Sequence, residues 1–156
     1  MIKQADVIII GGGATGAGVA RDCALRGIKA LLLERGDIAT GATGRNHGLL
    51  HSGARYAVTD RESAEECIKE NMILRKIARH CVEETEGLFI TLPEDDLAYQ
   101  AKFVESCQAA GINAQIIDPK EALRMEPAAN PDLIGAVTVP DGAVDPFRLT
   151  MANVLD

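Results

Sequence analysis

The sequence predicts an α/β fold that begins with a strand, a helix and a second, parallel strand. The first observation is a β-branched run at residues 5–10 (ADVIII), which is typical of a parallel strand buried on both faces. The second is a group of glycines that introduces a helical pattern over residues 14–26, closed by Gly27. The third is another short apolar run at residues 29–34 (KALLLE). Such a crossover places its two strands in one parallel sheet, in the right-handed sense.

A long loop and a long helix are expected next. Residues 35–59 are polar and rich in glycine, and connections of this length usually carry function. Residues 60–85 show the longest helical pattern, with Asp60 as N-cap and a broad apolar stripe. The Met and Cys side chains of this stripe are expected to pack in the core.

Shorter elements follow. The expected strands and helices alternate over residues 87–92 (strand), 95–110 (helix), 112–117 (strand) and 119–125 (helix). A turn at Pro140-Asp141-Gly142 predicts a hairpin between strands at residues 133–139 and 143–144. A last helix begins at Pro146 and continues to residue 156 without a stop signal, which predicts that the chain is cut there.

Composition argues against several classes of protein. The 156 residues are 47% apolar and 25% charged, as in ordinary globular domains, and length alone predicts one domain. The net charge of −7 argues against a nucleic-acid partner, which would need a basic surface. Four cysteines without a CxxC pair predict a reduced, cytoplasmic protein with all four thiols buried. No apolar run approaches the ~20 residues that cross a bilayer.

The glycine turn at residues 11–16 has the chemistry of a dinucleotide site. Gly11 permits a tight turn, Gly13 lets a pyrophosphate approach the backbone, and Gly16 lets helix and strand pack closely. The helix N-terminus presents unpaired N–H groups to the phosphates. Glu34 ends the second strand and is expected to accept hydrogen bonds from ribose hydroxyls, which disfavours NADP. The alternative is a glycine-rich turn without a ligand; a P-loop is excluded because its Lys-Ser/Thr pair is missing.

The next loop is more discriminating between FAD and NAD, which use the same crossover. Small residues within residues 40–56 would let a planar ring lie against the backbone. His47 and His51 are four residues apart, but Gly48 argues against a helix that would point both at a metal ion. No metal site is expected.

The motifs together resemble a known superfamily. The glycine turn, Glu34, residues 42–48 (ATGRNHG) and residues 51–56 (HSGARY) resemble the FAD-dependent oxidoreductases of the D-amino-acid oxidase and glycerol-3-phosphate dehydrogenase superfamily, in particular its bacterial anaerobic glycerol-3-phosphate dehydrogenases. The resemblance implies a Rossmann-like FAD-binding βαβ unit with part of an α+β substrate domain, in a truncated chain. The implied parts are residues 1–85 (first FAD-binding segment, with the helix at 60–85), 86–145 (part of the substrate domain) and 146–156 (start of a helix leading back to the FAD domain).

The resemblance also implies site residues. Those that match the cofactor-binding motifs are Gly11, Gly12, Gly13, Ala14, Thr15, Gly16, Glu34, Arg35, Thr43, Gly44, Arg45, Asn46, His47, Gly48 and His51. Arg55 and Tyr56 match an arginine and a tyrosine that lie near the substrate in aerobic relatives. Those relatives carry a His-Gly-Gly-x-Arg-Tyr motif, in which this sequence has Ser52 in place of a glycine. Arg55 is expected to bind a substrate phosphate, because its planar fork of donors matches that anion.

The activity implied by the resemblance is oxidation of sn-glycerol 3-phosphate to dihydroxyacetone phosphate, with the hydride passing from C2 to flavin N5. Electrons would pass through the B and C subunits of a membrane-associated complex to a quinone, with the protein in the cytoplasm on the inner face of the membrane. The catalytic base is expected beyond residue 156, so the chain alone would bind FAD weakly and show no turnover. Two alternatives stay open: an FAD enzyme for another 2-hydroxy or 2-amino acid, such as 2-hydroxyglutarate, and a non-catalytic dinucleotide-binding module.

Overall fold

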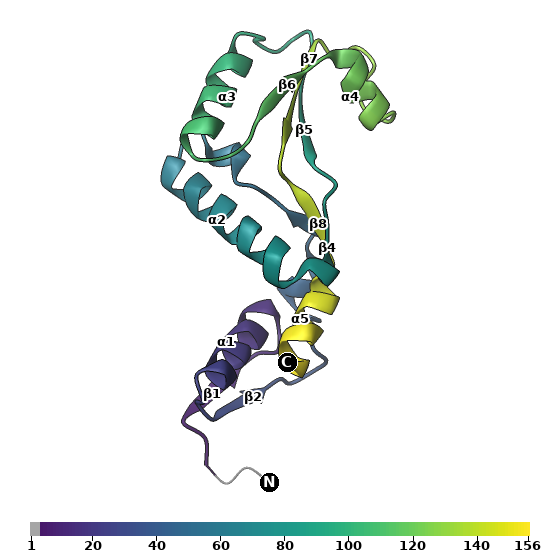
Figure 1. Ribbon diagram of the computed structural model, residues 1–156. Coiled ribbons are helices and arrows are strands. Elements are labelled where there is room, and N and C mark those ends of the chain that lie inside the picture. Colours follow the sequence, from purple (N-terminus) through teal and green to yellow (C-terminus); the bar gives the residue numbers. More distant parts are fainter. Residues whose placement is uncertain (1–3) are drawn as a thin grey trace. The chain divides into compact units, whose positions relative to one another are not determined.

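The computed structural model describes residues 4–156, which divide into two compact units (Figure 1). One unit combines the described residues up to Leu49 with Val144–Asp156, and the other is Leu50–Ala143. Parallel and antiparallel strands with interspersed helices confirm the predicted α/β class. The domain limits predicted at residues 85 and 145 stay a prediction.

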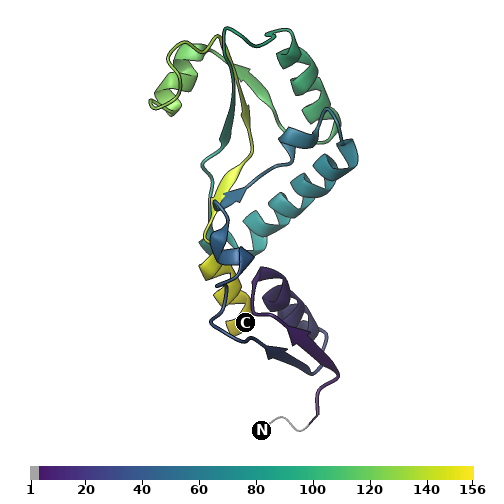
Figure 2. The ribbon, with the colours of Figure 1, turned by 180° about the vertical axis from the view of Figure 1, so that it is seen from behind.

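The first unit is built on the predicted crossover. Strand β1 (Val7–Ile10) pairs in parallel with β2 (Ala30–Leu33), and helix α1 (Ala14–Leu25) joins them. Helix α5 (Pro146–Leu155) begins at the predicted proline, and its N-cap Asp145 accepts hydrogen bonds from N–H groups of the first turn. It packs against α1, so the last helix of the chain belongs to the same unit as the first (Figure 2).

Strand β1 is not buried on both faces, and that prediction is wrong for this chain. Ile9 is 8% exposed and lies on the side of α1, beside Gly16. Ile8 and Ile10 are 62% and 87% exposed. Successive side chains of a strand point to opposite faces, and the face of Ile8 and Ile10 is open within residues 4–156.

Helix α2 (Arg61–Ile77) is shorter than the predicted helix at residues 60–85. Asp60 caps it as expected, because its carboxylate accepts a 3.1 Å hydrogen bond from Ser63 N–H. The helix ends at Ile77, and the chain continues through a 3₁₀ turn, η3 (Arg79–Cys81), into strand β4 (Val82–Glu83). Pairing of β4 in a sheet outweighs the helical pattern of its own residues.

The thiols follow the prediction only in part. Cys23, Cys81 and Cys107 are buried as predicted, whereas Cys67 on α2 is half-buried. Burial raises the pKa of the Cys107 thiol to about 11, and burial also raises the pKa of Cys67. Both thiols are therefore protonated at neutral pH and serve as packing side chains.

An antiparallel sheet forms the centre of the second unit. Its strand order is β5 (Gly87–Thr91), β7 (Gly135–Val139), β6 (Gln115–Ile117), with Phe89 opposite Val137. Helix α3 (Tyr99–Ala109) packs against the sheet and starts four residues later than predicted, because Asp95 and Asp96 form turns. The shorter helix α4 (Pro119–Met125) is as predicted. The largest core cluster contains Ala54, Ala57, Ala64, Ile68, Phe103, Cys107, Ala110, Ile112, Ala114, Val137 and Val139.

The predicted hairpin at Pro140–Gly142 does not form. Strand β8 (Gly142–Val144) lies between β3 (Leu49–Leu50) and β4 in a small separate sheet, while β7 belongs to the sheet of β5. The side chain of Asp141 turns inward and accepts a hydrogen bond from Ser52 N–H. The turn residues therefore carry the chain from one sheet to another instead of folding β8 back onto β7.

Candidate functional site

The glycine turn between β1 and α1 is tightly built. Gly11 has φ of 109°, a conformation that favours glycine, and its N–H donates to Leu33 O at 2.8 Å. A Cβ placed on Gly16 would lie 2.0 Å from Gly11 O and 3.4 Å from Ile9 Cγ2. Only a glycine at position 16 lets the first turn of α1 lie directly on the end of β1.

Glu34 and Thr43 both accept hydrogen bonds from the backbone at this turn. Glu34 Oε2 accepts a 2.7 Å hydrogen bond from Gly12 N–H, and Thr43 Oγ1 accepts a 3.0 Å hydrogen bond from Ala14 N–H. A Cβ on Gly13 would lie 2.8 Å from Thr43 Oγ1. The structure therefore brings the glycine turn, the expected ribose acceptor and the start of the second motif into one site.

Two backbone donors hold the Glu34 carboxylate. The N–H groups of Gly12 and Gly36 donate to its two oxygens, and they lower the pKa of Glu34 below its usual value. The side chain is exposed, so an ionised, fixed acceptor faces the outside of the turn. Gly13 caps α1 without a side chain, and the first turn of the helix carries no acidic residue. The helix N-terminus is therefore suited to an anion.

The second motif forms a short 3₁₀ turn, η1 (Ala42–Arg45), and a self-bonded loop. Asn46 Nδ2 donates to Thr43 O at 2.6 Å, and Asn46 Oδ1 accepts from Gly48 N–H at 2.6 Å. His47 Nδ1 accepts from Leu49 N–H at 3.1 Å. Asn46 and His47 thus shape the backbone of this loop. Within residues 4–156 no three His, Cys, Asp or Glu side chains are placed to share a metal ion.

Ala39 was not found by sequence reasoning, although it connects the two motifs. It is 2% exposed and has φ of 63°, which is unusual for a residue with a Cβ. Its N–H donates to Gly12 O at 3.0 Å, and its carbonyl oxygen lies 2.4 Å from the position of a Cβ on Gly44. An alanine outside any motif gives no sequence signal for such a role. Arg35 and Arg45, which sequence reasoning included, are both exposed.

Arg55 and Tyr56 form a second, separate group in the unit Leu50–Ala143. They lie in a 3₁₀ turn, η2 (Ala54–Tyr56), which follows Gly53. Arg55 is exposed, and its Cζ lies 5.3 Å from the centroid of the half-buried Tyr56 ring. The His51 ring meets the same tyrosine edge-on, with ring centroids 6.0 Å apart. Arg55 is therefore an available cation whose position is supported by an aromatic face.

Ser52, where the related motif has glycine, is fully buried. Its N–H donates to Asp141 Oδ1 at 2.6 Å, while its hydroxyl has no hydrogen-bond partner within residues 4–156. The backbone of residue 52 makes the contact, and a glycine could make the same one. The serine is therefore compatible with the motif.

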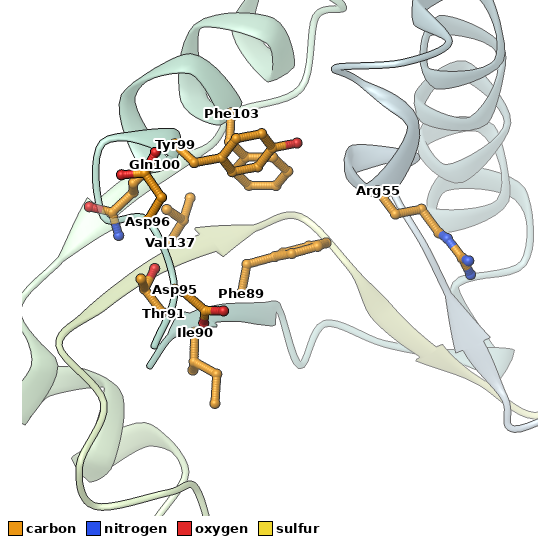
Figure 3. A pocket seen from close by; sticks show the side chains of 10 residues that line it. All are labelled: Arg55, Phe89, Ile90, Thr91, Asp95, Asp96, Tyr99, Gln100, Phe103 and Val137. Carbon is orange, nitrogen blue, oxygen red and sulfur yellow. The ribbon is translucent and has the colours of Figure 1, made fainter. Parts of the chain in front are cut away.

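A pocket of about 420 Å³ lies between the sheet and α3 (Figure 3). Phe89, Phe103 and Tyr99 give it an aromatic lining, and Asp95 and Asp96 place carboxylates at one side. Arg55 lines it with its side chain, but the guanidinium points away from the aromatic rings. The pocket suits an apolar or neutral group better than a phosphate, because two carboxylates would repel that anion.

Comparisons with known proteins agree on one relationship. The profile of the family described as FAD dependent oxidoreductase (DAO) matches residues 6–155. The chain is 78% identical over 151 residues to the A subunit of anaerobic glycerol-3-phosphate dehydrogenase from Haemophilus influenzae, and the match covers 97% of this chain and 27% of that protein. The chain thus spans about a quarter of the length of this curated relative.

Solved structures share the fold. Glycine oxidase from Geobacillus kaustophilus superimposes with a TM-score of 0.81 at 22% identity, covering 96% of this chain and 43% of that one. L-α-glycerophosphate oxidase from Mycoplasma pneumoniae, solved with FAD bound, gives a TM-score of 0.76 at 21% identity, covering 99% and 42%.

Proposed function

The chain belongs to the FAD dependent oxidoreductase family, and we propose that it acts as part of an FAD-dependent dehydrogenase that oxidises sn-glycerol 3-phosphate to dihydroxyacetone phosphate. Family membership confirms the resemblance inferred from the motifs, the fold class and FAD as the cofactor. The substrate is supported by the name of the relative from Haemophilus influenzae, with which the chain shares 78% identity.

The observation that carries the proposal is the convergence of Gly13, Glu34 and Thr43 at the start of α1. The residues fit a dinucleotide: backbone N–H groups and a helix N-terminus suit a pyrophosphate, and the fixed Glu34 carboxylate suits ribose hydroxyls. We assign the ADP half of FAD to Gly11, Gly12, Gly13, Ala14, Thr15, Gly16, Glu34 and Arg35. We assign the pyrophosphate and ring portion to Thr43, Gly44, Arg45, Asn46, His47, Gly48 and His51.

The bound flavin supplies a two-electron acceptor for the hydride at C2 of the substrate. Arg55 binds the substrate phosphate, since its guanidinium is exposed, permanently charged and matched to a phosphate in geometry. Tyr56 holds this guanidinium through the contact with its ring. We propose, as the resemblance implies, that the proton acceptor lies beyond residue 156.

The proposal also covers the path of the electrons after substrate oxidation. We propose that electrons leave through the B and C subunits of a complex to a membrane quinone, with the protein in the cytoplasm on the inner face of the membrane. The relative from Haemophilus influenzae is named as one lettered component of its enzyme, which supports a complex of several chains. Within residues 4–156, helices are too short or too polar to cross a membrane.

The decisive experiment is anaerobic reduction of the full-length flavoprotein followed by visible absorption. Glycerol 3-phosphate is expected to bleach the flavin bands, and 2-hydroxyglutarate and amino acids are not. If only 2-hydroxyglutarate or an amino acid bleached the flavin bands, that compound would take the place of glycerol 3-phosphate as the proposed substrate. A colourless protein that does not respond to added FAD would favour a non-catalytic module and contradict the proposal.

The 156-residue chain alone should behave differently from the full-length protein. We expect it to bind FAD weakly, because only the first segment of the FAD-binding domain is proposed to lie within it, and to show no turnover, because the proposed proton acceptor lies outside it. Equilibrium dialysis with FAD and dye reduction with glycerol 3-phosphate check this. Robust dye reduction by the purified chain would place all catalytic groups within these residues.

A further inference from the structure

Two side chains distant in sequence hold the backbone just before Arg55. Asp141 Oδ1 accepts a 2.6 Å hydrogen bond from Ser52 N–H. Asn71 Nδ2 donates to Leu50 O at 3.0 Å. The backbone is thus fixed on both sides of residue 51, from α2 and from the segment after β7.

Arg75 joins these two contacts into one network. Its Nε donates to Asn71 Oδ1 at 2.8 Å, and its Nη2 donates to Pro140 O and Asp141 O at 2.9 and 2.8 Å. Asn71 is 1% exposed, Asp141 is 7% exposed, and the Arg75 side chain is 14% exposed. Buried hydrogen-bonded groups of this kind are costly to leave unpaired, so the network favours one arrangement of its partners.

The held segment is continuous with the turn that carries Arg55. Gly53 follows Ser52 with φ of 88°, and a Cβ on it would lie 2.7 Å from Cys67 Cβ on α2. Ala54, the first residue of η2, is 3% exposed. A shift of residues 50–52 would therefore be transmitted to Arg55 through buried, packed residues.

We propose that Asn71, Arg75 and Asp141 are positioning residues for Arg55, and that they set the affinity for a phosphorylated substrate without touching it. This inference rests on the proposed function, specifically on the role of Arg55. The network residues lie on α2 and in the short connection between β7 and β8, and they act through the backbone of residues 50–52.

A double-mutant cycle in the full-length flavoprotein tests the proposal. We expect Asp141→Ala to raise KM for glycerol 3-phosphate about tenfold, the equivalent of about 1.4 kcal/mol of binding, with a smaller change in kcat and unchanged flavin content. Added to Arg55→Ala, it should raise KM no further, because both changes remove the same contact. Asp141→Asn should restore most of the affinity, since its amide oxygen can accept the Ser52 N–H. The control is Lys76→Ala, a cation next to Arg75 that is exposed.

Amide hydrogen exchange separates this proposal from the proposed function. Residues 51–57 should exchange faster in Asp141→Ala than in Asp132→Ala, an exposed aspartate of the same unit, whatever the substrate is. If Asp141→Ala does not fold, Arg75→Lys, which loses the fork to two carbonyls, should give the same changes. Additive effects in the cycle or unchanged exchange overturn the positioning role. A wild-type flavin that glycerol 3-phosphate does not reduce overturns the function and the substrate part of this inference.

Discussion

The glycine turn of the first unit and the Leu50–Tyr56 segment of the second unit are held in place by different means. The turn at residues 11–16 depends on missing side chains: a Cβ on Gly13 or Gly16 would lie within 3 Å of a neighbouring oxygen. The segment before Arg55 depends on side chains that are present, Asn71, Arg75 and Asp141, each of which bonds to backbone. A site formed by the backbone of consecutive residues can be recognised from a short sequence motif, whereas a site held by side chains distant in sequence cannot.

The largest expected effect breaks the glycine turn. Gly16→Ala would place a Cβ 2.0 Å from a backbone oxygen, so we expect a loss of about 3 kcal/mol or more and loss of bound flavin. The matched control is Gly18→Ala in the same helix, where nothing lies within 4 Å of a Cβ. That change should stabilise α1 by about 0.5–1 kcal/mol. Melting temperature and flavin content of the full-length variants check both; equal behaviour of the two would contradict the steric argument.

The next effect concerns the Leu50–Tyr56 segment, in which Gly53 packs closely against α2. Gly53→Ala would force an alanine into the left-handed region, at φ of 88°, and would place a Cβ 2.7 Å from Cys67 Cβ. We expect it to lower the free energy of unfolding by about 3 kcal/mol. Gly111→Ala has the same kind of backbone, φ of 80°, with open space around its Cβ, and should cost only about 1–2 kcal/mol. The difference in melting temperature isolates the contact with α2, and its absence would show that residue 53 can move away.

Removal of a carboxylate tests whether the backbone site also needs a side chain. Glu34→Ala removes the proposed ribose acceptor and should weaken FAD binding about tenfold, while Glu34→Gln, which keeps one oxygen, should weaken it less. Flavin fluorescence titration of the apoprotein measures both. Equal affinity in all three proteins would remove Glu34 from the proposed site.

The smallest effect is the pH dependence of the α2 cap. Hydrogen bonds from the Ser63 hydroxyl and N–H lower the pKa of Asp60, so its carboxylate stabilises the fold above its unfolded pKa. That stabilisation is lost as pH falls through the lower, folded pKa. Asp60→Ala should therefore reduce the melting temperature slightly at neutral pH, and the gap to wild type should close in strong acid. A gap that stays constant with pH would contradict the charged cap.

Local patterns predicted much of the fold. The crossover, the start of α5 at Pro146 and the Asp60 cap depend on residues near one another in sequence, and these predictions are confirmed. The predicted end of α2 and the predicted hairpin at Pro140–Gly142 were wrong, because both depend on β4 and β8 joining one small sheet. The predicted burial of Ile8 and Ile10 was also wrong, because an apolar run in the sequence does not show which faces of the strand are covered by neighbouring elements.

By itself, the sequence determined the dinucleotide motif, the family and the identity of Arg55 and Tyr56 as candidates for the substrate. These follow from glycines, an acid and short segments whose meaning is local or shared with relatives. Only the tertiary structure decided that Ala39 joins the two cofactor motifs and that Asn71, Arg75 and Asp141 hold the segment before Arg55. The physical reason is that a buried hydrogen bond between residues 21 or 89 positions apart is defined by packing and leaves no periodic pattern in the chain.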